Sequence, residues 1–174
     1  MITQSCASQI FLPRKHATLA HLAIKARSFG TLKLLMEHLP ELIKSTYEKG
    51  WRPLSYAANK GCLDEVTYLL TQFPKSAEEC DKDGSFPIHK VVGGGHVSII
   101  KAFYEHCPQT LHHIDNKGRN VLHILHIAVC YGRDDIFTYL TEELKMDDSF
   151  MNLKDIFTYG LTFITLSLFN LFYS

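Results

Sequence analysis

Two histidines stand three residues apart in the segment NVLHILHIAVCYG, which runs from Asn120 to Gly132. The tripeptide Leu-His-Ile occupies 122–124 and is repeated at 125–127. Imidazole nitrogens on one helix face are zinc ligands, but a zinc site also takes further Cys, His or carboxylate ligands. No third ligand stands at a recognisable spacing from this pair. We therefore favour an explanation of the repeated tripeptide that does not involve a metal. It comes from the spacing of residues along the chain.

Two other segments carry residue types that occur in phosphate-binding or zinc-binding sites. The run VVGGGH at 91–96 is rich in glycine, but phosphate-binding loops follow a strand and end in Lys and Ser or Thr. Cys107 stands near His112 and His113, without the second Cys that would complete a zinc motif. We interpret the glycines as a helix break and the Cys–His segment as a solvated loop. The serines, cysteines and histidines form no recognised nucleophile motif.

Composition narrows the class of protein. The 174 residues suit one domain, and 46% of them are hydrophobic, which is enough for a core. Lys plus Arg equals Asp plus Glu, 18 against 18, so no global charge draws the chain to nucleic acid or to anionic lipid. The five cysteines, at 6, 62, 80, 107 and 130, form no CxxC pair, which favours free thiols in a reducing compartment. The N-terminus shows no signal-peptide pattern.

A period of 34 residues runs through the chain. It relates glycines, prolines, histidines and aspartates: Gly50, Gly84 and Gly118; Pro40, Pro74 and Pro108; Gly61 and Gly95; His89 and His123; Asp81 and Asp115. Several residue types that share one interval indicate an internal repeat. Each repeat gives a turn, an apolar segment, a break of small residues, a second apolar segment and a proline. Repeat one fits the pattern from Ala17, although it lacks the glycines.

This order predicts a helix-turn-helix unit. Pro53 and Pro87 stand where a first helix should begin, because proline loses nothing in a first helical turn. Gly61 and Gly95 should end that helix in the left-handed conformation. A second helix should then carry its apolar residues on one face and stop at the next proline; in repeat two these residues are Val66, Leu69, Leu70 and Phe73. No segment alternates with period two, so we predict an all-α fold with almost no strand.

The doubled tripeptide fits the same period. His89 plus 34 gives His123, whereas Gly95 plus 37 gives Gly132. Residues before the doubled tripeptide therefore keep the 34-residue spacing and those after it keep 37. A three-residue insertion inside the first helix of repeat four, near His123–His126, explains both spacings. We expect LHIAVCYG to keep the packed position and Asn120–His123 to be displaced toward the preceding turn.

The repeat resembles the ankyrin repeat, whose signature begins Thr-Pro-Leu-His. The matching tetrapeptides are TLAH at 18–21, RPLS at 52–55, FPIH at 86–89 and NVLH at 120–123. The segments EKGWRPLSYAANKGCLDEVTYLL and CDKDGSFPIH further resemble plant ankyrin proteins of the accelerated-cell-death type. In that family an ankyrin domain precedes a membrane domain named for a Pro-Gly-Gly motif. The resemblance implies a solenoid in which His21, His89 and one of His123 or His126 bond backbone across a turn.

The period and the resemblance divide the chain into three parts. We expect an N-terminal extension at 1–16 and a four-repeat ankyrin domain at 17–155, with repeats at about 17–49, 50–83, 84–117 and 118–155. Residues 156–174 form a tail, IFTYGLTFITLSLFNLFYS, without a charge. Three interpretations of this tail stay open: non-homologous sequence from an altered or truncated gene, a membrane span of about 28 Å, or an apolar cap on the stack. If it inserts, Lys145 and Lys154 favour a cytosolic ankyrin domain.

Binding is the function that the architecture favours. Turn tips and first helices of such stacks line a concave groove, and the residues expected there are Trp51, Arg52, Tyr56, Lys60, Ser85, Phe86, Lys90, Arg119 and Asn120. Trp51 and Arg52 are of the types enriched in binding hot spots. The competing interpretation of Trp51 is packing on its own neighbouring loop.

These observations predict a non-catalytic protein-interaction module with no cofactor or metal, an unidentified protein partner and no nucleic-acid partner. By resemblance it acts in plant defence or cell-death signalling, on the cytosolic face of a membrane, with the plasma membrane favoured. A membrane-tethered adaptor, a soluble cytoplasmic protein and a truncated remnant with little activity are the alternatives. Four repeats, one with an insertion and neither end with an evident polar cap, also predict marginal stability or dependence on a partner.

Overall fold

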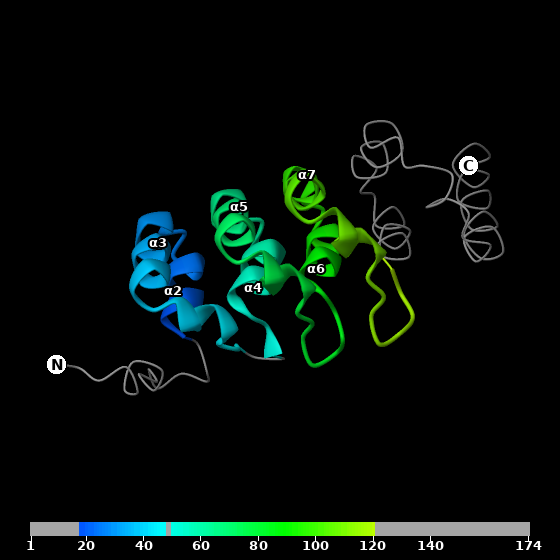
Figure 1. The fold of residues 1–174 in the computed structure, drawn as a ribbon, viewed down its shortest axis with the longest axis horizontal. Helices are drawn as coiled ribbons and strands as arrows, with labels where there is room; N and C mark the ends of the chain where they lie inside the picture. The colour runs from blue at the N-terminus through cyan, green and yellow to red at the C-terminus, as the bar shows by residue number, and fades with distance from the viewer. Residues whose placement is uncertain (1–17, 48–49, 121–174) are drawn as a thin grey trace, which may run out of the picture.

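The computed structural model describes residues 18–47 and 50–120, which form a stack of helix pairs (Figure 1). The first pair is α2 (Leu19–Lys25) and α3 (Phe29–His38), the second is α4 (Pro53–Lys60) and α5 (Leu63–Gln72), and the third is α6 (Pro87–Gly94) and α7 (Val97–His106). A short 3-10 helix follows each pair: η1 (Pro40–Lys44), η3 (Pro74–Glu78) and η4 (Pro108–His112). No strand occurs within the described ranges, so the all-α prediction is confirmed for them.

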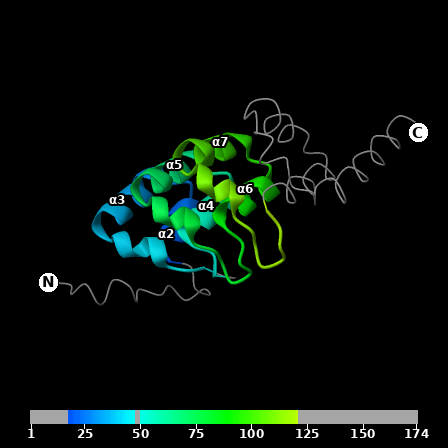
Figure 2. The ribbon, with the colours of Figure 1, turned by 45° about the vertical axis from the view of Figure 1, so that its right-hand side comes forward.

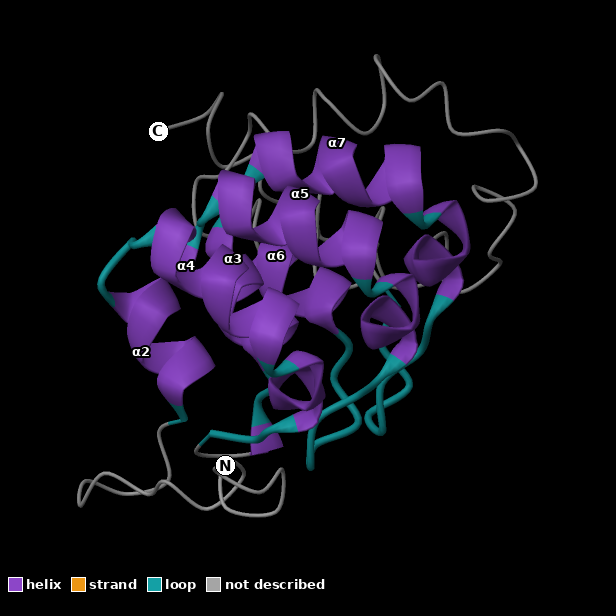
Figure 3. Ribbon diagram, turned by 60° about the vertical axis from the view of Figure 1, so that its left-hand side comes forward, coloured by secondary structure: helices purple, strands orange, loops and turns teal. Residues whose placement is uncertain are grey.

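The helices form two layers. The first helices of the pairs, α2, α4 and α6, lie side by side in one row, and α3, α5 and α7 form a second row, which lies above the first in the view of Figure 1 (Figures 1 and 2). The loops that join one pair to the next project beyond the first row, on the same side in each repeat (Figure 3). We call α2, α4 and α6 the inner helices and α3, α5 and α7 the outer helices.

The boundaries of the inner helices follow from proline and glycine. Pro53 and Pro87 occupy the first turns of α4 and α6, where the missing N–H is not needed. Gly61 and Gly95 end these helices with φ of 68° and 77°, which is the left-handed region that favours glycine. Both predictions are confirmed. Repeat one has Arg27 in the matching position, and its φ is 51°, so an arginine there carries the strain that glycine avoids.

The core is continuous through the described repeats. It contains one set of side chains from the inner helices, such as Leu54 and Ile88, and another from the outer helices, such as Leu32, Val66 and Ile100, all fully buried. These positions are 34 residues apart within each set, because each pair buries the same face against its neighbours. A helix pair of this size has too little apolar surface to fold alone, so each repeat depends on its neighbours.

The end of each outer helix differs in detail from the prediction. Val66, Leu69 and Leu70 are buried on one face of α5 as expected, but α5 ends at Gln72 and Phe73 follows it, half-buried against the core. The proline does more than stop the helix, since Pro40, Pro74 and Pro108 each begin a 3-10 helix. Proline is suited to this first position because its φ is already helical. The sequence signal for these 3-10 helices was the proline spacing itself.

The predictions for the extension at 1–16, for repeat four beyond Asn120, for the insertion near His123–His126 and for the tail at 156–174 fall outside the described residues.

Replacing Gly61 with alanine should destabilise the stack by about 1–3 kcal/mol. The new Cβ would require a left-handed alanine and would lie 2.6 Å from Cε1 of His96. Urea unfolding followed by circular dichroism measures the change. Gly30→Ala is the matched control, because a Cβ at Gly30 in α3 meets nothing within 4 Å and alanine favours a helix. Equal stability of G61A and the parent chain would contradict this account of the helix break.

Candidate partner-binding site

A hairpin turn with the same hydrogen-bond pattern follows each of the three described helix pairs. In each turn a backbone N–H donates to the carbonyl oxygen four residues later, from Tyr47 to Trp51 (2.7 Å), from Asp81 to Ser85 (3.0 Å) and from Asp115 to Arg119 (2.9 Å). The glycines at 50, 84 and 118 have φ of 79°, 70° and 72°, as a hairpin turn with a glycine bulge requires. The 34-residue period therefore sets the turns as well as the helices.

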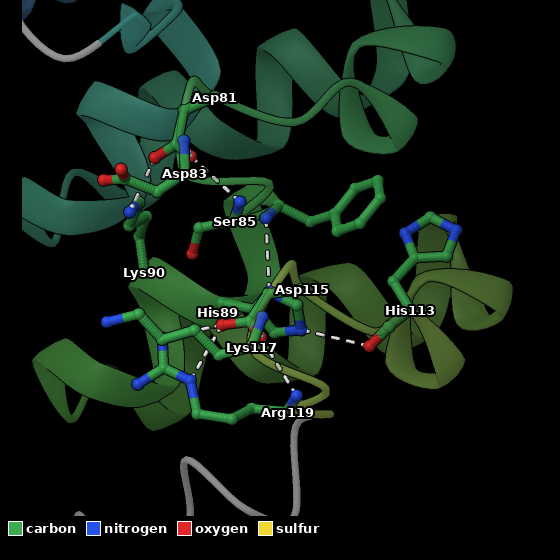
Figure 4. A network of polar contacts seen from close by, with 10 residues as sticks. Asp81, Asp83, Ser85, His89, Lys90, His113, Asp115, Lys117 and Arg119 are labelled. Carbon is green, nitrogen blue, oxygen red and sulfur yellow. Dashed lines mark hydrogen bonds and ion pairs between the residues drawn. The ribbon is translucent and has the colours of Figure 1, made fainter.

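Each of the second and third turns is stabilised from within by its own aspartate (Figure 4). Asp81 Oδ1 accepts hydrogen bonds from the backbone N–H groups of Asp83 and Ser85, each at 2.9 Å. Asp115 Oδ1 does the same for Lys117 and Arg119, at 2.8 and 2.9 Å. Asx turns of this kind satisfy backbone donors that the hairpin leaves unpaired. Tyr47 replaces the aspartate in the first turn and packs edge-on against Tyr56 instead.

Neighbouring turns also touch one another. A Cβ on Gly50 would lie 2.7 Å from Cγ of Lys82, and a Cβ on Gly84 would collide with the side chain of Asn116. Each of these glycines therefore has two functions, a positive φ and a close approach by the next turn. The turns of the described repeats form one contiguous surface as a result.

Buried histidines connect two of the inner helices, α2 and α6, to the loop that follows their helix pair. His21 Nε2 donates to the carbonyl of Trp51 at 3.0 Å, and His89 Nε2 donates to the carbonyl of His113 at 3.1 Å. The other nitrogen accepts: His21 Nδ1 from the Thr18 hydroxyl at 2.7 Å, and His89 Nδ1 from a backbone N–H at 3.2 Å. The role expected for His21 and His89 is therefore confirmed, and this bonding requires the neutral ring.

Burial keeps both histidines neutral. It lowers the pKa of His21 from 6.5 to about 4, against the opposing effect of the hydrogen bond to Trp51. Burial also lowers the pKa of His89, and the bond to His113 opposes it less strongly. A charged imidazole would lose its solvation in the stack.

The carboxyl group of Asp115 responds differently. Burial alone raises its pKa, but the hydrogen bonds from Arg119 and Lys117 outweigh burial, so the net shift of this pKa is downward.

Three ion pairs lie among the turns. Arg52, at the start of α4, pairs with Glu79 in the next loop. Lys90 Nζ lies 2.7 Å from Asp81 Oδ2 and also 5.0 Å from the centre of the Trp51 ring. Arg119 Nη2 lies 2.6 Å from Asp115 Oδ2. These pairs neutralise Glu79, Asp81 and Asp115 within the protein.

The structure separates the nine residues expected in the binding groove into two groups. The side chains of Tyr56, Ser85 and Asn120 are buried and so offer little surface to a partner. Lys60 is exposed, and the remaining five are half-buried: Trp51, Arg52, Phe86, Lys90 and Arg119. We call the surface formed by the three turns and the inner helices the turn-tip face.

Trp51 was expected either to face a partner or to pack within the protein, and the structure shows features of both. Its ring packs against the core of the stack, as the packing interpretation predicts, yet the side chain is only half-buried and contacts Lys90. Phe86 stacks on His113 with 4.2 Å between ring centres, so it too is partly a packing residue. Sequence reasoning missed Glu79, Lys82 and the pairing role of Asp81. The only signal for Asp81 was its 34-residue spacing from Asp115.

The glycine-rich segment at 91–96 and the Cys–His segment at 107–113 belong to the helical framework. The glycines of VVGGGH end α6, as the helix-break interpretation predicts. Cys107 is buried and His112 is exposed. Within 18–47 and 50–120, no three His, Cys, Asp or Glu side chains are grouped as metal ligands. None of the helices in these ranges has the length and apolar character needed to cross a membrane.

With their helix pairs, projecting hairpins and the buried histidines that bond to the next loop, the described residues have the architecture of an ankyrin-repeat solenoid. The sequence profile described as ankyrin repeats (3 copies) matches residues 73–155. Ankyrin repeats are protein–protein interaction modules and are typically non-catalytic.

The chain is similar to Protein ACCELERATED CELL DEATH 6 of Arabidopsis thaliana. The two are 41% identical over 71 residues, which cover 41% of this chain and 11% of that protein. It is also 31% identical over 90 residues to Alpha-latrotoxin-Lhe1a of Latrodectus hesperus, over 52% of this chain and 6% of the toxin. The chain thus spans only a small part of the length of these relatives. The resemblance to plant ankyrin proteins of the accelerated-cell-death type is confirmed by the first of them.

The stability of the stack should fall as the pH decreases from 6.5 to about 4. The unfolded chain binds a proton at His21 with a pKa near 6.5, whereas the folded chain does so only near 4, so acid favours unfolding. This one group should remove about 3 kcal/mol of unfolding free energy across that range. Urea unfolding at several pH values measures it.

In the variant His21→Gln the pH dependence should be shallower, because the titrating ring is gone. His106→Gln is the control, since His106 is exposed on α7, and its pH dependence should match the parent chain. An unchanged slope in H21Q would contradict the assignment of this titration to His21.

Proposed function

We propose that this chain is a non-catalytic adaptor that binds another protein through the turn-tip face and acts in plant defence or cell-death signalling. The observation that carries the binding surface is the ordered row of turns beside the inner helices, where Trp51, Arg52 and Lys90 remain partly accessible. The similarity to Protein ACCELERATED CELL DEATH 6 supports the physiological setting. The partner is a protein, and the proposal includes no nucleic acid, cofactor or metal.

The proposed binding residues are Trp51, Arg52, Lys60, Phe86, Lys90 and Arg119. Arg52 and Lys90 already hold carboxylates of their own chain, so their side chains are fixed before a partner arrives. Fixed side chains lose less conformational freedom on binding, which favours affinity. The half-buried Trp51 ring adds apolar area beside these charges. The division at 1–16, 17–155 and 156–174 remains part of the proposal.

Site-specific photo-crosslinking tests the binding face. A benzophenone side chain at Lys82, which is exposed on the second turn, should crosslink to a partner protein in plant cells. The same group at Lys101, which is exposed on the outer helix α7, serves as the control and should not give that adduct. Mass spectrometry identifies the products. Identical adducts from both positions, or none from Lys82, would contradict the proposed face.

We further propose that the chain acts at the cytosolic face of a membrane, with the plasma membrane as the first candidate and a soluble cytoplasmic location as the alternative. The uncharged segment 156–174 supports this adaptor hypothesis, since its length suits a bilayer core.

Removing residues 156–174 should move the protein from the membrane pellet to the supernatant of a cell lysate. The physical reason is that an apolar segment of this length is the strongest source of membrane affinity in the sequence. Fractionation of cells that express the full chain and the shortened chain measures the change. Pelleting that persists without the tail would exclude the tail as the anchor.

A further inference from the structure

Charge is divided unequally between the two layers of helices. The inner helices carry three lysines and no acidic residue; the lysines are Lys25, Lys60 and Lys90. The outer helices carry two lysines and four acidic residues: Lys33, Lys101, Glu37, Asp64, Glu65 and Glu105. Although the chain has zero net formal charge, the described inner helices are thus positively charged and the described outer helices negatively charged.

The turns add to the positive charge of the inner layer. Their carboxylates are largely used inside the protein, because Glu79, Asp81 and Asp115 all lie in ion pairs and the two aspartates also accept backbone hydrogen bonds. Lys82 and Lys117, in contrast, are exposed and have no ion pair within the described ranges; Asp83 is the exposed carboxylate that opposes them. Lys60 is exposed as well and lies 5.6 Å from the Tyr56 ring centre. Among the described residues of the turn-tip face, the free charge is thus mainly positive.

Trp51 supplies an unsatisfied donor on the same face. Its indole N–H is buried and has no hydrogen-bond acceptor within the described structure. A buried donor without an acceptor destabilises the unbound protein, so an oxygen that reaches it is favoured. Lys90 lies over the same ring. A partner carboxylate that draws the Lys90 ammonium group toward itself would change the surroundings of the indole.

We propose that the turn-tip face binds an acidic, extended segment of a partner protein, whose carboxylates pair with Lys60, Lys82 and Lys117 while Trp51 and Lys90 contact the same segment. This inference rests on the proposed function and specifies the chemistry of the partner. An extended segment fits because the cations recur along the stack, at successive repeats. Charge complementarity across such a face speeds association and selects the partner.

A protein segment fits these observations better than a nucleic acid does. Nucleic-acid sites combine a strongly basic surface with aromatic rings free to stack on bases. Here the Trp51 ring is packed against the core and covered by Lys90, and Phe86 is stacked on His113.

Fluorescence titration of the full chain tests the inference, because Trp51 is its single tryptophan. The ligand is a twelve-residue peptide of alternating Glu and Ser, and the comparison peptide has Gln in place of Glu. The acidic peptide should bind at least about tenfold more tightly, should change the Trp51 emission, and should bind more weakly as salt is added. Equal binding of the Gln peptide would overturn the proposal.

Charge-removing variants locate the interaction. The triple variant K60Q/K82Q/K117Q should weaken the acidic peptide by about tenfold, whereas K33Q/K101Q, on the outer helices, should leave its affinity unchanged. All five lysines are exposed, so both variants should keep the circular dichroism spectrum of the parent. An equal loss in both variants would overturn the proposed face. Binding of a thymidine dodecamer as tight as that of the acidic peptide would overturn the choice of a protein segment.

The photo-crosslinking experiment separates this inference from the proposed function. A partner adduct at Lys82 together with no binding of the acidic peptide would overturn the acidic chemistry alone. Absence of both would overturn the binding face itself.

Discussion

The apolar faces of the helix pairs in this chain are covered only by neighbouring pairs, and everything else in the structure depends on that constraint. Leu54 and Ile88 are fully buried at the same position of successive inner helices. A pair by itself would leave such residues in water, so the repeats must stand at a fixed spacing. The hydrogen bond from His21 to Trp51 and that from His89 to His113 set this spacing at the turns. They do so with neutral rings, since burial disfavours the charged form.

The same spacing creates the candidate site. Because Gly84 has no side chain, the next turn approaches it closely at Asn116, and successive turns form one surface. Asp81 and Asp115 stabilise the turns from within and take part in ion pairs with Lys90 and Arg119. The carboxylates are thus used for folding, and the remaining lysines are available to a partner. Folding and binding therefore share the same turns but use charges of opposite sign.

The sequence alone was sufficient to predict where the helices begin and end, but not which side chains of the turn-tip face are buried. Proline and glycine act locally, so Pro53, Gly61 and Pro87 defined the helices without knowledge of the rest of the chain. The 34-residue period then ordered the helices, because identical units can stack in only one way. Side-chain burial on the turns depends on contacts between repeats, which no local pattern encodes. For this reason the expectation that Ser85 and Tyr56 line the binding groove was wrong, since both are buried between repeats. The pairing of Arg52 with Glu79 also joins residues whose spacing carries no signal.

The most direct test of the central claim is the protonation state and tautomer of the buried histidines, observed by long-range ¹H–¹⁵N NMR at pH 5.5. The account predicts that His21 is neutral there with its proton on Nε2, and that the neutral form of His89 also carries its proton on Nε2. Signals that show both ring nitrogens of His21 protonated at this pH, or the proton of neutral His89 on Nδ1, would contradict it, because Nδ1 must be free to accept the hydrogen bonds from Thr18 and Phe86.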